Sequence, residues 1–406
     1  MGEGFRFLVG VDWGESAYQV CILDGDGRRE KELVVEHSGA ALERFFGELG
    51  KLAGREPQAV AVAIETPRGA MVEGLIEKGF TVFSINPKQL DRFRDRHTVA
   101  GAKDDRRDAY VLADSLRNDR HLFRPLKLDD PLVIELREHS RLHDDLVEQL
   151  GRASNQLRQQ LHRYFPQVLE LSSAANDPWI WALLKVAPTP ESVQRLSPHR
   201  LQKILTTFHI RRFDLIQVAE ALSATPLPVA PGVTQAASAH VKLLLPRLEL
   251  LHEQLKQCDK RLDELLEVMK ADSDIEEHRG ARILLSLPGI GRSVAATMLA
   301  EAPQAVAQAD YAMLRSLSGA APVTKSSGKG HYVLMRRACN HRLRNAVYHM
   351  ARGYMQRDPD GRQRYLALRQ RGLSHARALR TLADRLLRVL TAMLRNGTTY
   401  QAAVLA

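Results

Sequence analysis

Four acidic side chains stand where a protein can use them together. Asp12 and Glu65 each follow directly on an apolar run typical of a buried strand. The ends of adjacent parallel strands point into one crevice, so these two acids are expected to be close in space. Asp105 and Asp108 are three residues apart and share a face if their segment is helical. Asp104, four residues before Asp108, is an alternative to Asp105.

Carboxylates brought together repel one another unless a cation neutralises them, and oxygen-rich clusters suit Mg²⁺ or Mn²⁺. The chemistry this predicts is metal-assisted attack on a phosphodiester, with two metals about 4 Å apart. Each acid taken singly also has a structural interpretation. Asp12 can be a turn residue, Glu65 a helix N-terminal charge, and Asp105 and Asp108 favourable charges in a first helical turn.

A serine near residue 327 is a second candidate for chemistry. Residues 318–330 are rich in Gly and Ser, and Ser327 lies there between Lys325 and Lys329. A serine in a flexible, positively charged loop can approach a phosphate and act as a nucleophile. The alternatives are that Ser326 has this role, or that both serines merely fill the loop.

The segment Leu284–Ala296 reads as a helix-hairpin-helix. Gly289 and Gly291 allow a tight turn, and the backbone N–H groups that open the next helix can hold a phosphate. A plain corner between two helices is the alternative. The glycines do not follow a strand, which disfavours a dinucleotide-binding site.

The first 125 residues alternate strand and helix signals. We expect strands at Phe7–Val11, Tyr18–Leu23, Glu32–Val35, Ala59–Ile64 and Thr81–Ile85, with helices over Ala40–Leu52, from Pro67 to about Lys78, and from about Lys103. The order β-β-β-α-β-α-β-α is that of an RNase H-like (RuvC-like) α/β fold.

Residues 126–275 carry helix signals without strands. A long amphipathic helix is expected over 131–165, and a heptad pattern follows Pro246 with apolar residues in alternating steps of three and four, from Leu248 to Met269. This coiled-coil segment should pair with the 131–165 helix or with another subunit, although an ordinary bundle helix fits as well. Residues 276–406 form a third, helical domain with the helix-hairpin-helix, the serine loop and an arginine-rich tail.

The positive charge is concentrated in that tail. The whole chain has a net charge of +10, but residues 331–400 hold 15 Arg, no Lys and 3 Asp, and the remainder is close to neutral at −2. Such an excess favours a polyanion as partner over a merely solvated surface. The nucleic-acid-binding residues predicted here are Gly289, Gly291, Lys329, Arg336, Arg337, Asn340, Arg342 and Arg344.

Several classes of protein are disfavoured by composition. No apolar run approaches the roughly 20 residues that a membrane span needs, and the first residues lack the apolar core of a secretory signal. The three cysteines are far apart in sequence, so neither a disulfide scaffold nor a structural zinc site is expected. A reducing, cytoplasmic setting fits this cysteine usage.

The order and spacing of these motifs resemble those of the DEDD transposases of insertion sequences, the IS-one-ten family, also described as bridge-RNA-guided recombinases. The resemblance rests on Gly10-Val11-Asp12, Ile64-Glu65, Lys103-Asp104-Asp105-Arg106-Arg107-Asp108-Ala109, Leu287-Pro288-Gly289-Ile290-Gly291 and the block from Ser327-Gly328 to Asn340-x-x-Leu343-Arg344. These motifs span nearly the whole chain. Their combination is specific.

The resemblance implies a role for each matched residue. Asp12, Glu65, Asp105 and Asp108 fall on the family's metal ligands, and Ser327 falls on its nucleophile, which forms a covalent phosphoserine link to DNA. It further implies that a non-coding RNA pairs with donor and target DNA, and that subunits assemble as a dimer or tetramer so that acids and serine from different chains meet.

Two positions depart from the family pattern. Glu15 stands where the family often has lysine, and Cys339 stands where glycine commonly precedes the asparagine. Neither is one of the five catalytic positions. They leave the subgroup, and with it the position of the guide RNA, undecided. Two other functions stay open: a RuvC-like nuclease that uses only the carboxylates, and a non-catalytic nucleic-acid-binding protein whose acids are structural.

Overall fold

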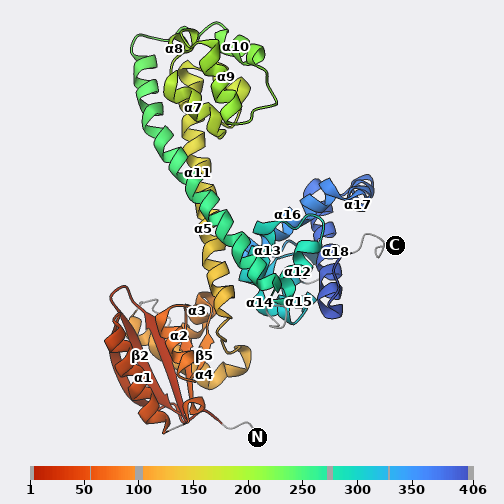
Figure 1. The fold of residues 1–406 in the computed structure, drawn as a ribbon. Helices are drawn as coiled ribbons and strands as arrows, with labels where there is room; N and C mark the ends of the chain where they lie inside the picture. Colours follow the sequence, from red (N-terminus) through yellow and green to blue (C-terminus); the bar gives the residue numbers. More distant parts are fainter. Residues whose placement is uncertain (1–3, 55, 97–103, 272–277, 328–329, 401–406) are drawn as a thin grey trace. The chain divides into compact units, whose positions relative to one another are not determined.

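The computed structural model describes residues 4–54, 56–96, 104–271, 278–327 and 330–400 (Figure 1). Two compact units divide the chain: the first ends at Asp129 and the second begins at Asp130. The predicted boundary at 275 lies inside the second unit, and a separate third domain stays a prediction. Within the described residues, no helix has the length and apolar character needed to cross a membrane.

The first unit is a five-stranded sheet between two layers of helices. Its elements are β1 Phe7–Trp13, β2 Ala17–Asp24, β3 Arg29–Glu36, α1 Gly39–Ala53, β4 Val60–Ile64, α2 Ala70–Glu77, β5 Thr81–Ser84, α3 Pro87–Arg94 and α4 Asp105–Asp119. The strand order is β3-β2-β1-β4-β5. β1, β2 and β3 pair antiparallel, while β4 is parallel to both β1 and β5. This confirms the mixed α/β architecture expected for this part of the chain.

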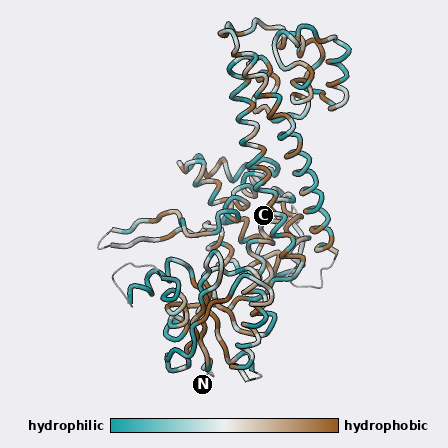
Figure 2. Tube along the Cα trace, turned by 90° about the vertical axis from the view of Figure 1, so that its left-hand side faces the viewer, coloured by the Kyte–Doolittle hydropathy of each residue, from teal (hydrophilic) through white to brown (hydrophobic). Residues whose placement is uncertain are grey.

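The two faces of the sheet are buried separately. Alternate residues of β1 and β4, such as Val9 and Val62, pack with α1 and α2 on one face. The intervening residues, such as Leu8 and Ala61, pack with α3 and α4 on the other. The central strands are therefore apolar on both sides, which is why they read as continuous runs in the sequence. Figure 2 shows these hydrophobic strands inside more hydrophilic helices.

Helix α3 was not predicted from the sequence. Its start carries a recognisable signal, because Asn86 caps the helix by accepting a hydrogen bond from the Lys88 amide and Pro87 occupies the first helical position. The helix has eight residues and only two buried side chains, Leu90 and Phe93, so its apolar periodicity is too short to recognise.

The second unit is helical apart from one hairpin. Its elements are α5 Pro131–Tyr164, α6 Gln167–Leu171, α7 Pro178–Val186, α8 Pro190–Gln194, α9 Pro198–Thr207, α10 Leu215–Ser223, α11 Val233–Ala271, α12 Arg279–Ser286, α13 Arg292–Glu301, α14 Pro303–Ala307, α15 Tyr311–Leu317, β6 Val323–Ser327, β7 Gly330–Leu334, α16 His341–Arg357, α17 Pro359–Gln370 and α18 His375–Asn396. Residues from α5 to α18 share one hydrophobic core.

The two longest helices of this unit, α5 and α11, pack along each other (Figure 1). This is the intrachain pairing expected for the heptad segment, and Leu248, Leu262 and Met269 are buried in it. The expected start after Pro246 was wrong, because α11 begins at Val233 and runs through the proline. Pro246 has no amide hydrogen to donate to the carbonyl one turn earlier in α11. Because Pro246 is exposed, water can form a hydrogen bond to that carbonyl instead.

The close packing of α4 on β1 depends on Gly10. A Cβ atom at this position would overlap the carbonyl oxygen of Ala109 and lie 2.7 Å from the amide nitrogen of Ala113. Only hydrogen at Gly10 lets the α4 backbone lie directly on the strand. Because α4 carries Asp105 and Asp108, this contact also sets where those two acids lie.

We predict that Gly10→Ala lowers the free energy of unfolding by about 2–3 kcal/mol, because α4 must move away from β1. Gly47→Ala is a matched control: Gly47 lies inside α1 with open space around it, and alanine there should stabilise the helix by up to about 1 kcal/mol. Urea unfolding of both variants checks this. Equal stability of Gly10→Ala and wild type would contradict the packing described.

Candidate active site and nucleic-acid interface

Asp12 and Glu65 lie side by side at one edge of the sheet. In the parallel pair of β1 and β4, Val11 stands opposite Ile64, and the two acids are the next residues of their chains. Asp12 is 8% exposed, although β1 continues one residue further to Trp13. Both acids are therefore found at the carboxyl ends of adjacent parallel strands, as expected.

Helix α4 brings the second pair of acids to the same place. Asp104 is the N-cap residue, and its carboxylate accepts a hydrogen bond from the Arg106 amide. Asp105 is the first helical residue, and Asp108, one turn later, is buried at 3% exposure. Asp104 is thus used as the helix cap, whereas the charge of Asp105 acts on Asp12, which favours Asp105 over Asp104 as a member of the site.

The electrostatics of Asp12 show that the four acids are near one another. Burial raises the pKa of Asp12, and the charges of Asp108, Asp105 and Glu65 raise it further, to about 7. Each neighbouring carboxylate disfavours a negative charge on Asp12. The structure thus brings all four predicted acids into one electrostatic group, called here the acid cluster.

Arg94 is a member of this site that the sequence did not reveal. Its Nε donates to Asp108 Oδ1 at 2.6 Å and its Nη2 donates to Asp108 Oδ2 at 2.7 Å. Its Nη1 donates to Asp91 at 2.7 Å. The pairing joins residues fourteen apart in sequence, so spacing alone gives no signal for it.

The chemistry of the acid cluster fits a divalent cation. Its donors are carboxylate oxygens, the ligands that Mg²⁺ and Mn²⁺ prefer, and its mutual repulsion is the kind a cation relieves. No three His, Cys, Asp or Glu side chains among the described residues are already grouped as metal ligands. Asp12, Glu65, Asp105 and Asp108 are the residues that would hold the ion.

Ser327 is the last residue of β6, opposite Gly330 in the β6–β7 pair. The expectation of a flexible loop over 318–330 was wrong for this part, because residues 323–327 and 330–334 form an antiparallel hairpin. The strand residues Tyr332 and Val333 are exposed, so no apolar face was available to predict the strand. Lys329 lies outside the described residues.

A buried carboxylate holds the start of α16 next to the hairpin. Glu301 accepts a hydrogen bond from Asn340 at 2.7 Å and lies 3.1 Å from Arg141 and 3.2 Å from Arg342. Burial alone would raise the pKa of Glu301, but the hydrogen bonds from Arg141 and Asn340 keep it below its usual value. Asn340 also caps α16 by accepting from the Leu343 amide.

Three of the residues predicted to bind nucleic acid make contacts within the protein. Asn340 and Arg342 already have partners inside the protein, and Arg344 donates to the backbone oxygen of Arg336. Arg337 is exposed. Direct contact of these residues with nucleic acid stays a prediction, while the contacts just described hold the start of α16 against α13 and α5.

The turn before α13 rests on the backbone of α16. Gly289 has a φ of 92°, which favours glycine, and a Cβ on it would lie 2.7 Å from the carbonyl oxygen of Met350. A Cβ on Gly353 would lie 2.8 Å from the Gly289 Cα. Two glycines thus allow the turn and the helix to approach closely.

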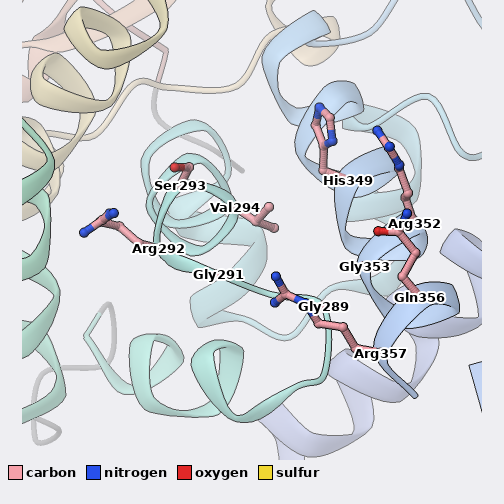
Figure 3. Close-up of a pocket in the computed structure, with 10 residues that line it drawn as sticks. All are labelled: Gly289, Gly291, Arg292, Ser293, Val294, His349, Arg352, Gly353, Gln356 and Arg357. Carbon is pink, nitrogen blue, oxygen red and sulfur yellow. The ribbon is translucent and has the colours of Figure 1, made fainter. Parts of the chain in front are cut away.

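A cavity of about 330 Å³ opens beside this contact (Figure 3). Its lining includes Gly291 and Ser293 at the start of α13, with His349, Arg352 and Arg357 from α16. Figure 3 shows His349 and Arg352 on one stretch of α16, with the Arg357 side chain extending beside Gly289. None of the lining residues is acidic, which makes the cavity a natural site for an anion.

The excess of arginine over acid continues beyond α16 onto α17 and α18. The three acids of this region are used internally: Asp384 accepts from Arg315 and Tyr311, Asp360 from Arg364 and Tyr354, and Asp358 caps α17. Exposed arginines of the two helices remain, namely Arg362, Arg369, Arg377, Arg385, Arg388 and Arg395. The positive charge of this part of the sequence therefore lies on the protein surface.

Two family models match the chain. One is described as a transposase and named for the DEDD transposase domain of IS110; it matches residues 9–166. The other is described as a transposase of the IS116/IS110/IS902 family and matches residues 281–366. The first range contains the whole acid cluster, and the second contains the turn at Gly289 and the hairpin with Ser327.

Relatives extend the match over nearly the full chain. The "Mini-circle putative transposase for IS117" of Streptomyces coelicolor is 31% identical over 397 residues, 95% of this chain and 93% of that protein. The "Insertion element IS116 uncharacterized 44.8 kDa protein" of Streptomyces clavuligerus is 30% identical over 408 residues, 98% of this chain and 97% of that protein. The "Putative transposase y4uE" of Sinorhizobium fredii is 48% identical over 218 residues, which span 52% of this chain and 61% of that protein.

The matched domains define a transposase, an enzyme that cuts and rejoins DNA. The chain belongs to the IS116/IS110/IS902 family of transposases.

The raised pKa of Asp12 predicts that the acid cluster lowers the free energy of unfolding in a pH-dependent way. In the folded chain this pKa is about 7, above the ordinary value of 3.8, so between these values the folded state holds a proton that the unfolded state has lost. The contribution of Asp12 to stability is therefore highest below about pH 4 and is lost as the pH rises to about 7. With metal chelated, the free energy of unfolding of wild type relative to Asp12→Asn should fall over this range.

Urea unfolding in EDTA from pH 4 to pH 8 measures this difference. Asn cannot titrate and is nearly isosteric, so it removes the charge without opening a cavity. A difference that stays flat across the range would contradict the coupling among the four acids.

Proposed function

We propose that this transposase cuts DNA at the acid cluster and holds the cut end on a serine. The observation that carries the proposal is that four acids, Asp12, Glu65, Asp105 and Asp108, lie near one another. The charges of the last three, together with burial, raise the pKa of Asp12. The strand order β3-β2-β1-β4-β5, with α4 packed on β1, supports an RNase H-like (RuvC-like) assignment for the first unit. In such a fold the acids would hold Mg²⁺ or Mn²⁺.

The four carboxylates would supply the oxygen ligands. A bound divalent ion there stabilises the negative charge that develops on a phosphodiester during displacement. Parallel strands position Asp12 and Glu65, and α4 positions Asp105 and Asp108, so the donors lie on regular elements of the unit or directly beside them. Burial of Asp12 and Asp108 keeps bulk water from competing for the same contacts.

Ser327 would act as the nucleophile. Its hydroxyl oxygen forms a bond to phosphorus, the bond from phosphorus to the leaving sugar oxygen breaks, and the serine proton ends on that sugar hydroxyl. A hydroxyl from another DNA end then reverses the step and frees the serine. One phosphodiester is exchanged for another, so rejoining needs no energy-supplying cofactor. The glycine after the serine and the basic residues around it support this assignment.

Acids and serine belong to different units of the chain. The reaction would therefore require two units to meet on the DNA, and the family resemblance implies that they come from different subunits of a dimer or tetramer. The same resemblance implies a non-coding RNA that selects the DNA by base pairing. In that arrangement the protein reads backbone and shape while the RNA reads sequence.

The nucleic-acid backbone would be held in part by the cavity between the α13 turn and α16. Backbone N–H groups at the start of α13 and the guanidinium groups of Arg352 and Arg357 are donors suited to a phosphate. The cavity lining contains no carboxylate that would oppose it. In this proposal Gly289 and Gly291 have the nucleic-acid-binding role predicted from the sequence, and α16 forms the other wall of the cavity.

A metal-dependent nuclease without serine catalysis is the second candidate. The observation that favours it is that the acid cluster is complete within the first unit, without a contribution from Ser327. Such an enzyme would cut branched DNA and release both products, and the hairpin would only bind the substrate.

A covalent adduct separates the two candidates. We expect wild type, incubated with Mg²⁺ and a DNA substrate carrying the element ends, to give a protein–DNA species that survives denaturing electrophoresis. Ser327→Ala should remove this species and strand exchange together, because no other group replaces the oxygen that bonds to phosphorus. Ser326→Ala is the matched control and should retain both. Adduct-free cleavage that persists in Ser327→Ala would instead support the nuclease.

The proposed role of the cavity arginines predicts how DNA affinity depends on salt concentration. Replacing Arg352 and Arg357 by Ala should weaken DNA binding and reduce the slope of log affinity against log salt by roughly 1.8, because each lost phosphate contact accounts for about 0.9. Arg158→Ala with Arg247→Ala removes the same charge from exposed positions on α5 and α11. Fluorescence anisotropy over a salt series compares the pairs, and equal slopes for both would count against the cavity.

A further inference from the structure

Arg94 contacts the acid cluster from outside it. The guanidinium group binds both carboxylate oxygens of Asp108, at 2.6 and 2.7 Å. The Asp108 side chain is 4% exposed and that of Arg94 is 16% exposed, so the pair is largely removed from water. Paired this way, Asp108 has its negative charge compensated by a cation of the protein itself.

A divalent ion would have to compete with this pairing. Both oxygens of Asp108 are directed at the arginine, and a metal ligand needs at least one of them directed at the ion. A guanidinium group beside the cluster would also repel an incoming cation, most strongly where water does not screen it.

Arg94 has a second carboxylate to bind when it leaves Asp108. Its Nη1 already donates to Asp91, which lies one helical turn earlier on α3 and is 67% exposed. An arginine released from the cluster can thus remain paired on the surface of its own helix. The movement needs only side-chain rotation, because α3 itself keeps its place through Leu90 and Phe93.

We propose that Arg94 takes the place of a metal ion in the metal-free enzyme and is displaced from Asp108 when a divalent ion binds. Arg94 then sets the metal concentration at which the cluster fills, and it protects the fold from the repulsion of four carboxylates until that point. The proposal rests on the metal site of the proposed function. It adds a residue that controls how readily the site is occupied.

Titration of the full-length protein with Mn²⁺, followed by the electron paramagnetic resonance of the free ion, tests this. Arg94→Gln should bind Mn²⁺ with a dissociation constant lower than that of wild type by at least roughly tenfold, the factor expected for one charge-assisted hydrogen bond, because the two bonds from Arg94 to Asp108 no longer have to be broken. Its thermal midpoint in EDTA should fall below that of wild type, and saturating Mn²⁺ should close the gap. Arg94→Lys keeps the charge and should remain near the wild-type affinity.

Arg96→Gln is the matched control. Arg96 lies two residues further along and pairs with Asp119 at 2.6 Å, outside the acid cluster, so its loss should leave Mn²⁺ affinity unchanged. An unchanged or weaker Mn²⁺ affinity in Arg94→Gln would overturn the proposal, the latter because Arg94 would then orient Asp108 for the metal. If no variant binds Mn²⁺, the metal site of the proposed function fails, and the two failures are thereby distinguished.

Discussion

Repulsion among four carboxylates is the constraint around which the first unit is built. Asp12 is buried among three other acids and its pKa is raised to about 7, so the cluster is unfavourable to fold without a cation. The surrounding elements hold it nonetheless. The parallel register of β1 and β4 fixes two acids, and the hydrogen-only position of Gly10 lets α4 fix the other two. Arg94 compensates part of the charge from outside the sheet.

The second unit has one continuous hydrophobic core, and it carries a hairpin and a basic surface. The exposed strands of β6–β7 have little core of their own, and an isolated two-stranded hairpin is marginally stable. The chain that follows the hairpin is held at the start of α16 by the Glu301 network, in which Asn340, Arg141 and Arg342 meet on a buried carboxylate. Arginines near the serine in sequence therefore hold the fold together, whereas Arg352 and Arg357, farther along α16, line an open cavity.

Much of the first unit was predictable because its signals are local. Apolar runs gave all five strands to within a few residues, and the acids followed from their places after two of those runs and on one helix face. The choice between Asp104 and Asp105 could not be made from spacing alone; it depended on which carboxylate caps α4. Arg94 was missed because its partner Asp108 is fourteen residues away and because α3 buries too few side chains to be recognised. The passage of α11 through Pro246 and the pairing of 323–327 with 330–334 likewise depend on tertiary surroundings.

The central claim is that the four acids form one metal site, and anomalous diffraction from a Mn²⁺-soaked crystal tests it most directly. The account predicts an anomalous peak bounded by the carboxylates of Asp12, Glu65, Asp105 and Asp108, with Arg94 turned away from Asp108 toward Asp91. A crystal with Mn²⁺ bound elsewhere and no peak among these four side chains would contradict it.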